Sequence, residues 1–287
     1  MLTHPDINPI AVAIGPISVH WYGIMYLFAF ASAWALAVHR AKRPNSALNV
    51  KQVEDLIVYG ALGVVLGGRF GYVMFYNFGA WLEDPLWLLR VWEGGMSFHG
   101  GLVGVLVAMT IYSRRLGVKF PEMMDFTAVR VPEGLGFGRL GNFIGQELWG
   151  RETDVPWGII FPRDPDALVR HPSQLYQAFL EGVVLFVILY WFSQKPRPRL
   201  AVSALFLICY GIFRFAVEFV RAPDAHIPEL LFGWMTRGQL LTIPLIIGGF
   251  GIFIWAYTKG FAVAASPQES SDKIEKTPKT HKKANAK

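Results

Sequence analysis

Charged residues are scarce in this sequence. Asp, Glu, Lys and Arg make up 17% of its 287 residues, while hydrophobic residues make up 53%. An average soluble protein has roughly a quarter of its residues charged, so the deficit indicates a membrane protein. The net charge is +6, but no basic patch lies on the body of the chain. Nothing therefore favours a nucleic-acid partner.

Cysteine is almost absent as well. The single cysteine, Cys209, lies in an apolar run, which excludes an internal disulfide and a cysteine metal cluster. We interpret it as a small apolar filler. The motifs H-E-x-x-H and G-x-S-x-G and the Walker phosphate loop are missing too, and no cofactor or metal is indicated. Gly136, Gly138 and Gly141 match G-x-G-x-x-G, but without a preceding strand they do not make a dinucleotide site.

Positive charge is missing from the first 16 residues, which contain no Lys or Arg. A secretory signal peptide begins with a charged segment. We therefore expect no cleavable signal peptide, and the first apolar segment is long enough to stay in the membrane.

Six segments are apolar over about the 20 residues that a helix needs to cross a bilayer. They are residues 17–38, 55–76, 96–113, 174–193, 200–220 and 238–258. Basic residues follow the first, third, fourth and sixth segments and are expected in the cytoplasm. The chain is then inside both before and after 120–193, which requires a further crossing. Only 122–143 can provide it, although it contains Pro132 and several charges; the alternative is a re-entrant segment with another span miscounted.

The predicted fold is an all-α polytopic membrane protein with seven transmembrane helices. Its N-terminus is expected outside and its C-terminus in the cytoplasm. The tryptophan-rich stretch near 81–92 predicts a helix lying in the membrane interface. Residues 1–260 are expected to form one transmembrane domain. Residues 261–287 are rich in Lys, Ser and Ala and predict a disordered basic cytoplasmic tail, which either touches anionic lipid or, as we favour, only reinforces the topology.

Polar side chains gather at the expected outer ends of four helices. They are Tyr22, His99, Arg139, Asn142, Tyr210, Arg214, Glu218 and Arg221, with Glu147 just beyond. Tyr210, Arg214 and Glu218 follow one another at intervals of four, which places them on one helix face. Lysine is absent from the spans. Arginine binds phosphate through paired donors, and histidine moves a proton near neutral pH, so the pattern indicates a site for an anionic phospholipid headgroup.

Simpler interpretations remain for each of these residues. Arg214 and Glu218 could be a structural ion pair, His99 a packing residue and Tyr22 an interfacial aromatic. Glu147 and Arg151 could pair in solvent. For four further charged residues within the spans, structural pairing is the better interpretation; these are Arg69, Arg130, Glu133 and Glu181.

Five blocks of sequence resemble, in order, those of a known family. They are HWYGIMY at 20–26, GGMSFHGGLVG around His99, GRLGNFIGQELWG at 138–150, HPSQLY at 171–176 and YGIFRFAVEFVR at 210–221. The chain is thereby identified as similar to the prolipoprotein diacylglyceryl transferases of bacteria over about residues 16–258. Gly145 departs from the family pattern, which usually has asparagine there.

The resemblance implies a seven-helix enzyme of the bacterial inner membrane with its active site toward the outer leaflet. Such an enzyme transfers the diacylglyceryl group of phosphatidylglycerol to the lipobox cysteine of a prolipoprotein, forming a thioether and releasing glycerol phosphate. On the matched positions His99, Arg139 and Arg214 would be essential. The supporting residues would be Tyr22, Asn142, Glu147, Tyr210 and Glu218, and Arg221 lies close to the same helix face. His99 would act either as the base for the thiol or as a positioning group.

Two other classes of protein share some of these sequence features. A phospholipid transporter or flippase could use the same arginines, but the chain shows no internal repeat. An intramembrane hydrolase could use Ser97 and His99, but these two residues would face different sides of a helix and no nucleophile elbow is present.

Overall fold

The protein is mostly helical in the computed structural model, which describes residues 2–15, 17–43, 46–222 and 234–259. The helices are α1 (Trp21–Ala41), α2 (Val50–Tyr76), α3 (Phe78–Glu83), α4 (Phe98–Leu116), α5 (Phe120–Ala128), α6 (Val131–Gly145), α7 (Ser173–Gln177), the π-helical stretch η3 (Ala178–Val184), α8 (Leu185–Phe192), α9 (Ala201–Val217) and α10 (Arg237–Thr258). Five short strands accompany them: β1 (Leu2–Thr3), β2 (Ile10–Ile14), β3 (Ile17–His20), β4 (Ile159–Ile160) and β5 (Val169–Arg170). The fold is thus helical as expected, with small sheets at one end.

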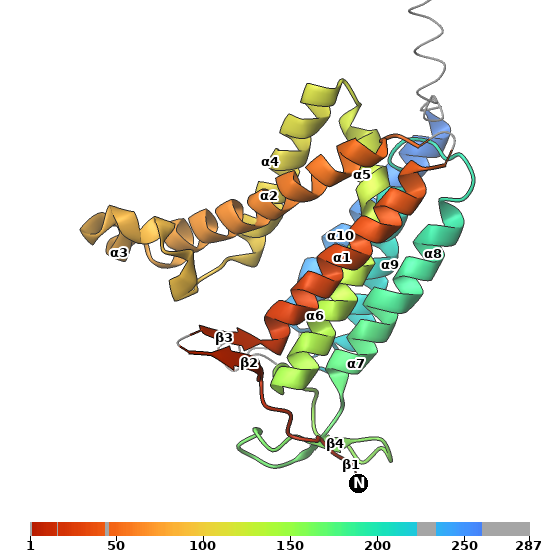
Figure 1. The fold of residues 1–287 in the computed structure, drawn as a ribbon. Coiled ribbons are helices and arrows are strands. Elements are labelled where there is room, and N and C mark those ends of the chain that lie inside the picture. Colours follow the sequence, from red (N-terminus) through yellow and green to blue (C-terminus); the bar gives the residue numbers. More distant parts are fainter. Residues whose placement is uncertain (1, 16, 44–45, 223–233, 260–287) are drawn as a thin grey trace, which may run out of the picture.

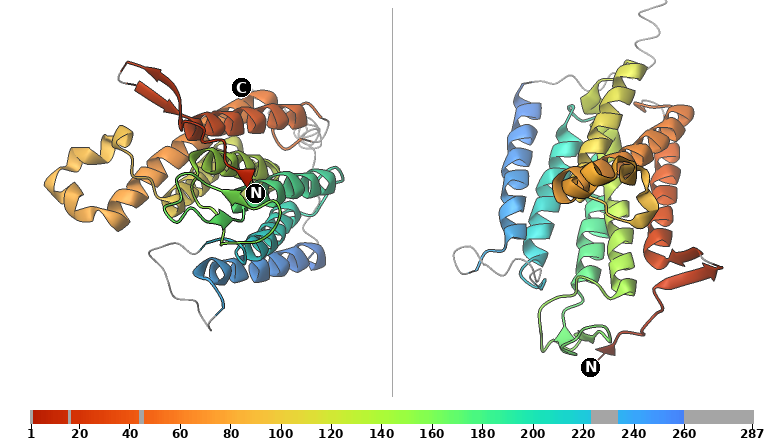
Figure 2. Two further views of the ribbon diagram at one scale, coloured as in Figure 1. Left: turned by 90° about the horizontal axis from the view of Figure 1, so that it is seen from below. Right: turned by 90° about the vertical axis from the view of Figure 1, so that its left-hand side faces the viewer.

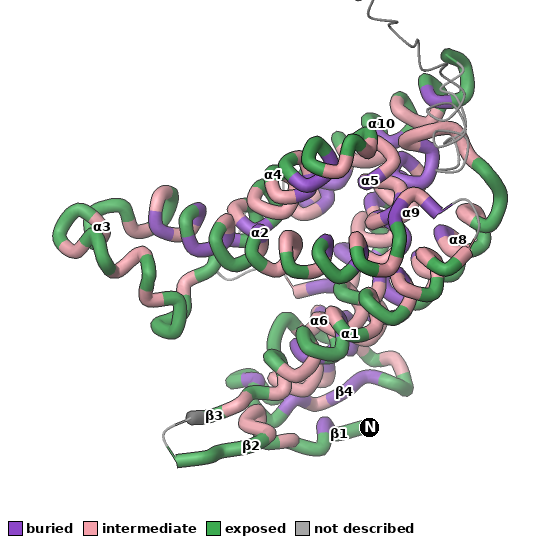
Figure 3. The backbone as a smooth tube through the Cα atoms, turned by 45° about the horizontal axis from the view of Figure 1, so that its top comes forward, coloured by how far each residue is buried: buried purple, intermediate pink, exposed green. Residues whose placement is uncertain are grey.

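The helices form a bundle with an arm. Figures 1 and 2 show α1, α6, the α7–η3–α8 run, α9 and α10 side by side, with α2 and α4 leaning away from them and α3 at the tip of the arm. At the other end of the bundle from the chain's last helical turn, β1 pairs with β4 and β4 with β5. Figure 3 shows that α3 and β2 are largely exposed, whereas β4 is covered.

Four helices or helical runs among the described residues are long and apolar enough to cross a membrane. They are Trp21–Ala41, Val50–Tyr76, Ser173–Phe192 and Arg237–Thr258. Large apolar side chains such as Leu66, Trp191 and Ile247 are exposed on them, which suits contact with lipid. The chain is therefore a membrane protein. The helices α4 and α9 lie where membrane spans were expected, but they do not reach the same length and hydropathy. The number of seven spans and the side of the membrane on which each terminus lies therefore stay predictions.

The expected span 122–143 is divided into two helices. The first, α5, ends at Ala128 and the second, α6, begins at Val131, with Pro132 in its first turn. Proline has no amide hydrogen and its ring clashes with the preceding turn, so it kinks or breaks a helix interior but is tolerated in a first turn. The break before Val131 places Pro132 in such a first turn. The expected polar residues Arg139 and Asn142 lie on α6.

The prediction of one continuous helix near 81–92 is wrong. The chain there forms α3 followed by two short 3₁₀ turns, Pro85–Leu89 and Val91–Glu93. Asp84 between them has an extended backbone (φ −139°, ψ 87°). A residue before proline is pushed out of the helical region by the proline ring, and Pro85 therefore ends α3.

Glycines allow α2 and α4 to cross in direct contact. A Cβ atom on Gly67 would lie 2.4 Å from the carbonyl oxygen of Gly100, and one on Gly104 would lie 2.1 Å from that of Gly63. No side chain fits at such distances, so the backbones touch as the spacing of Gly63, Gly67 and Gly71 indicated.

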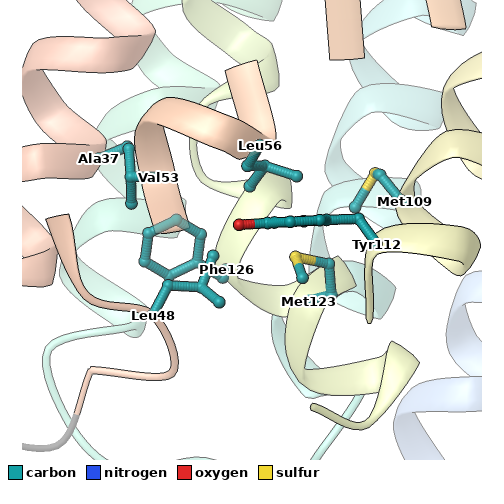
Figure 4. Packing of buried hydrophobic residues seen from close by; sticks show 8 residues of the cluster. All are labelled: Ala37, Leu48, Val53, Leu56, Met109, Tyr112, Met123 and Phe126. Carbon is teal, nitrogen blue, oxygen red and sulfur yellow. The ribbon is translucent and has the colours of Figure 1, made fainter. Parts of the chain in front are cut away.

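A hydrophobic cluster anchors the base of the arm. Figure 4 shows its members from α1, α2, α4, α5 and the segment before α2; these are Ala37, Leu48, Val53, Leu56, Met109, Tyr112, Met123 and Phe126. The Tyr112 hydroxyl within it donates to the Gln52 carbonyl at 3.0 Å. The arm is therefore packed onto the bundle at its base, while its tip stands free of it.

Arg69 holds the tip of the arm together, and its loss is expected to open that tip. Arg69 is 2% exposed, and its guanidinium donates to four carbonyls, those of Trp87, Leu88, Gly94 and Gly95. Because hydrogen bonds from a charged donor contribute roughly 1.5–3 kcal/mol each, Arg69→Ala should destabilise this segment by about 3 kcal/mol or more. Hydrogen exchange over residues 84–97 would measure it.

A neighbouring arginine supplies the control for this change. Arg90 pairs with Asp84 and Glu93 in the same segment, but its side chain is 36% exposed. Exposed ion pairs contribute roughly 0–1 kcal/mol, so Arg90→Gln should leave exchange nearly unchanged. Equal protection in the Arg69→Ala and wild-type proteins would show that these carbonyls are held by other contacts.

An ion pair braces the small sheet at the end of the bundle. Arg170 on β5 donates to Asp164 through Nε at 2.5 Å and Nη2 at 2.9 Å, and this pair is buried. The Arg170 guanidinium holds the pKa of Asp164 below its ordinary value of 3.8. The backbone amides of Asp166 and Leu168 also donate to this carboxylate. Asp164 therefore organises the turn before β5.

This pair gives a pH dependence of stability with a defined sign. Since the folded pKa of Asp164 lies below its unfolded value, the unfolded chain takes up a proton first as the pH falls. The stabilisation is complete above the ordinary value of 3.8 and is lost as the pH falls below it. Thermal unfolding from pH 3 to 7 should show this loss in the wild type and a flatter profile in Asp164→Asn. Asp166→Asn, with its side chain 65% exposed, should keep the wild-type profile, and a wild-type profile in Asp164→Asn would refute the assignment.

Candidate functional site

Charged side chains from three helices converge on a buried glutamate. Glu181 on η3 is fully buried, and Arg139 on α6 places its Nε 3.8 Å from Glu181 Oε2. Arg214, Glu218 and Arg221, on or just after α9, are its other charged neighbours. Tyr210 has Glu181, Arg214 and Arg139 around it. The helices α6 and α9 lie on either side of the α7–η3–α8 run (Figure 2). Arg139 and Arg214 therefore come to Glu181 from two different helices.

Glu218 is the second carboxylate of this cluster, and a residue at the start of α10 holds it in place by a hydrogen bond. Arg214 Nη1 lies 2.8 Å from Glu218 Oε2, and Arg221 Nη1 lies 3.6 Å from Oε1. Thr236, which caps the N-terminus of α10, donates its hydroxyl to Glu218 Oε1 at 3.0 Å. A Cβ on Gly238 would lie only 2.5 Å from the same oxygen. The turn that begins α10 thus leaves room for this carboxylate and orients it toward the two arginines.

Several buried polar atoms of the cluster have no hydrogen-bond partner among the described residues. They are Arg214 Nη1, Glu218 Oε2 and both carboxylate oxygens of Glu181. The ion pairs are close enough for attraction but lack hydrogen-bond geometry. A buried polar group without a partner costs roughly 1–3 kcal/mol, so such groups point to a polar ligand or water that would complete the site.

A second group of predicted residues lies beside Arg139. Asn142 Nδ2 donates to Glu147 Oε2 at 3.4 Å, and Tyr22 on α1 has Glu147 and Arg139 among its charged neighbours. A cavity of about 60 Å³ lies here, lined by Pro9, His20, Trp21, Tyr22, Gly141, Gly145 and Glu147. Arg139 therefore lies near both the carboxylate cluster and Tyr22, one of the residues that line this cavity.

Gly145 lines the cavity but is not required there by the backbone. A Cβ at this position would meet no atom closer than the Glu147 carboxyl carbon at 3.6 Å, which is an ordinary contact. The backbone therefore has room for a side chain beside Glu147.

His99 is the predicted site residue that the structure does not bring to the others. It lies in the first turn of α4, on the arm, with its ring exposed and edge-to-face against Phe98. Its side chain forms no hydrogen bond or ion pair with Arg139 or Arg214, all three being described residues. Ser97 has a structural use, because its hydroxyl caps α4 by accepting from the Gly100 amide at 3.2 Å. A Ser97–His99 hydrolase site is therefore not supported.

The simpler interpretations of the other charged residues have different outcomes. Arg151 donates to the Arg221 carbonyl at 3.1 Å, so its side chain is used there rather than in a solvent pair with Glu147. Arg69 is structural, as expected. Glu181, which the sequence favoured as a structural partner, lies at the centre of the cluster.

Two glutamines of the site were missed in the sequence. Gln174 and Gln177 are fully buried on α7, in line with Glu181 at intervals of three and four. Gln174 Nε2 donates to the Glu147 carbonyl at 2.7 Å, while both amide atoms of Gln177 lack a partner among the described residues. Their helical spacing in an otherwise apolar span was the signal that could have found them.

The fold and the cluster define a helical membrane protein with buried arginines and glutamates gathered among its helices. Comparison with known proteins narrows this class. The profile of the family described as prolipoprotein diacylglyceryl transferase matches residues 9–255. The chain therefore belongs to the prolipoprotein diacylglyceryl transferase family, which confirms the resemblance.

Curated relatives extend over nearly the whole chain. A protein of Teredinibacter turnerae is 60% identical over 267 residues, covering 90% of this chain and 93% of the relative. One of Ectopseudomonas mendocina is 55% identical over 259 residues (90% and 97%), and one of Acinetobacter baylyi is 57% identical over 262 residues (90% and 96%). All three are named phosphatidylglycerol–prolipoprotein diacylglyceryl transferase.

Proposed function

We propose that this chain transfers the diacylglyceryl group of phosphatidylglycerol to the lipobox cysteine of prolipoproteins, the first step of lipoprotein maturation. Membership of the family and the names of its relatives support the reaction. The structural observation that carries the proposal is the convergence of Arg139, Arg214 and Arg221 on Glu181 and Glu218. Arginines held among buried carboxylates suit a phosphate that develops charge during a reaction.

The reaction exchanges one bond of the lipid for another. The cysteine thiolate attacks the glycerol carbon that carries the phosphate ester, a carbon–sulfur bond forms, and the carbon–oxygen bond to the phosphate breaks. The bonding electrons leave with glycerol phosphate, and the thiol proton passes to a base. A free thiol has a pKa of about 8.5, so the positive field of the arginines favours the reactive thiolate.

The residues then take distinct roles. Arg139 and Arg214 would bind the phosphate and stabilise the leaving group, and Glu218 would orient Arg214 and Arg221. Tyr22, Asn142 and Glu147 would line the neighbouring part of the substrate site, with Tyr210 beside Glu181; no metal enters this scheme.

His99 acts in this scheme only if the prolipoprotein peptide lies between the arm and the bundle. The arm carries His99 while the arginines lie in the bundle, so a thiol held between the two would meet both. His99 would then be the base for the thiol or would position the peptide.

The orientation in the membrane completes the proposal. Residues 1–260 would form one transmembrane domain of the bacterial inner membrane, crossing seven times with α5 and α6 together as the fourth span. The N-terminus would be outside, and the site would face the outer leaflet. The tail 261–287, expected to be disordered and cytoplasmic, lies outside the described residues.

A reconstituted reaction tests the proposed function. Purified protein in detergent would receive phosphatidylglycerol and a short lipobox peptide, and peptide mass and released glycerol phosphate would be measured. We expect a diacylglyceryl gain in mass matched by glycerol phosphate, and no gain for a peptide with serine in place of the cysteine. Lipid binding by folded protein without any gain in mass would favour a phospholipid transporter instead.

A further inference from the structure

A second cluster of arginines lies at the other end of α1 and α6. Arg40 is in the last turn of α1, Arg43 lies one turn further along, and Arg130 immediately precedes α6. All three side chains are half-buried. Arg139 follows Arg130 by nine positions, which is roughly 14 Å along a helix. Figure 1 shows the end of α1, the start of α6 and the end of α8 together, away from the strands.

Arg43 is held by neutral or weakly basic partners. Its Nη2 donates to the Tyr190 hydroxyl at 3.0 Å and lies 3.2 Å from His39 Nε2, and its Nη1 donates to the Gln194 side chain. These contacts fix the guanidinium against the end of α8. None of them supplies a negative charge.

Arg130 is held in a similar way. Its Nη1 donates to the Phe126 carbonyl at 2.6 Å, and its guanidinium lies 4.6 Å from the centre of the Phe126 ring. Its Nε is buried and has no hydrogen-bond partner among the described residues. The charges of Arg40 and Arg43 repel it, while that of Glu133 attracts it.

The cluster carries more positive than negative charge. Within the described ranges, Arg40, Arg43 and Arg130 form no ion pair, whereas Arg199 is paired with Glu122 at 2.6 Å. Like charges in a half-buried place repel one another with little screening, and Glu133 offsets only one of the three. A bound anion would relieve the repulsion.

We propose that Arg40, Arg43 and Arg130 form a binding site for the phosphate of an anionic phospholipid in the cytoplasmic leaflet. Arginine binds phosphate oxygens through paired donors, and basic pockets between transmembrane helices on this side of a membrane bind anionic headgroups. The exposed Trp191 and Val187 beside Tyr190 offer a surface for acyl chains, which a free phosphate would not need. The site is separate from the proposed catalytic cluster and does not depend on its activity.

Lipid binding to detergent-solubilised protein tests the site. Native mass spectrometry would titrate phosphatidic acid, phosphatidylcholine and, separately, inorganic phosphate against the wild type and Arg40→Gln/Arg43→Gln. We expect the double variant to bind phosphatidic acid at least about tenfold more weakly, with phosphatidylcholine weak in both. The matched control is Arg114→Gln/Lys119→Gln, which removes two exposed charges from the same expected side.

The outcomes separate the possible explanations. Full binding by the control and weak binding by Arg40→Gln/Arg43→Gln support the site, provided both unfold at the wild-type temperature; if the double variant is unstable, Arg43→Gln alone is used. The Arg139→Gln variant should still bind phosphatidic acid at the Arg40, Arg43 and Arg130 cluster, which distinguishes this site from the catalytic cluster. Equal losses in the test and control variants would refute a specific site. If millimolar inorganic phosphate abolishes the binding of phosphatidic acid at this site, the ligand is free phosphate and not a lipid.

Discussion

Replacing Arg214 with glutamine is expected to lower the rate of diacylglyceryl transfer by about 10³-fold or more. Its Nη1 is buried, lies 2.8 Å from Glu218 and has no hydrogen bond among the described residues. A phosphate oxygen would supply that hydrogen bond. Removing one preorganised donor to a developing negative charge costs roughly 10²–10³ in rate, and this change also removes a full positive charge. The initial rate of glycerol phosphate release at saturating phosphatidylglycerol would measure the loss.

Two further variants define what this loss means. Arg214→Lys keeps the charge but not the paired donors, so we expect it to recover less than about a tenth of the activity. Arg114→Gln removes an exposed arginine of α4 and should leave the rate unchanged. If Arg214→Gln retains more than a tenth of the wild-type rate while remaining folded, Arg214 is a structural partner of Glu218 and the phosphate lies elsewhere.

The sequence located the helices because membrane spans carry a long and uniform signal. The apolar segments at 55–76, 174–193 and 238–258 correspond to α2, the α7–η3–α8 run and α10 to within a few residues. The spacing of Tyr210, Arg214 and Glu218 likewise placed them on one helix face. Both inferences use only helix periodicity and the length of an apolar segment, which can be read from one segment without knowing its neighbours.

Interruptions of the helices were less predictable. Pro85 and Pro132 mark two of them, and the preference of proline for a first helical turn was available in the sequence. The π-helical stretch η3 has no comparable signal in the residues that form it. It nonetheless carries Glu181, whose central position depends on α6 and α9 packing against both sides of it.

The placement of His99 shows the limit of sequence reasoning most directly. Depth in the membrane could be assigned from topology, and it grouped His99 with the arginines. The position of His99 within the membrane plane could not be predicted in this way, because it depends on how α2 and α4 lean relative to the bundle. That angle is set by the contact of Gly104 with Gly63 and by the cluster at the base of the arm, which are contacts between segments far apart in the chain.

Gly104→Ala is expected to destabilise the arm by about 2–3 kcal/mol, because overpacking a tight contact costs roughly that much. The new Cβ would lie 2.1 Å from the Gly63 carbonyl oxygen and 2.8 Å from the Gly67 Cα. Both are backbone atoms, so the clash is relieved only if α4 moves away from α2. Thermal unfolding in detergent would measure the loss of stability.

Gly60→Ala on α2 is the matched control, because a Cβ there meets nothing within 4 Å. Alanine exceeds glycine in helix propensity by roughly 1 kcal/mol, so this variant should be as stable as the wild type or more so. Gly104→Ala unfolding at or above the wild-type temperature would show that the helices do not touch at this crossing. Since α4 also carries His99, its displacement should slow transfer in Gly104→Ala but not in Gly60→Ala. An unchanged rate in a destabilised Gly104→Ala protein would mean that the reaction does not depend on the position of His99.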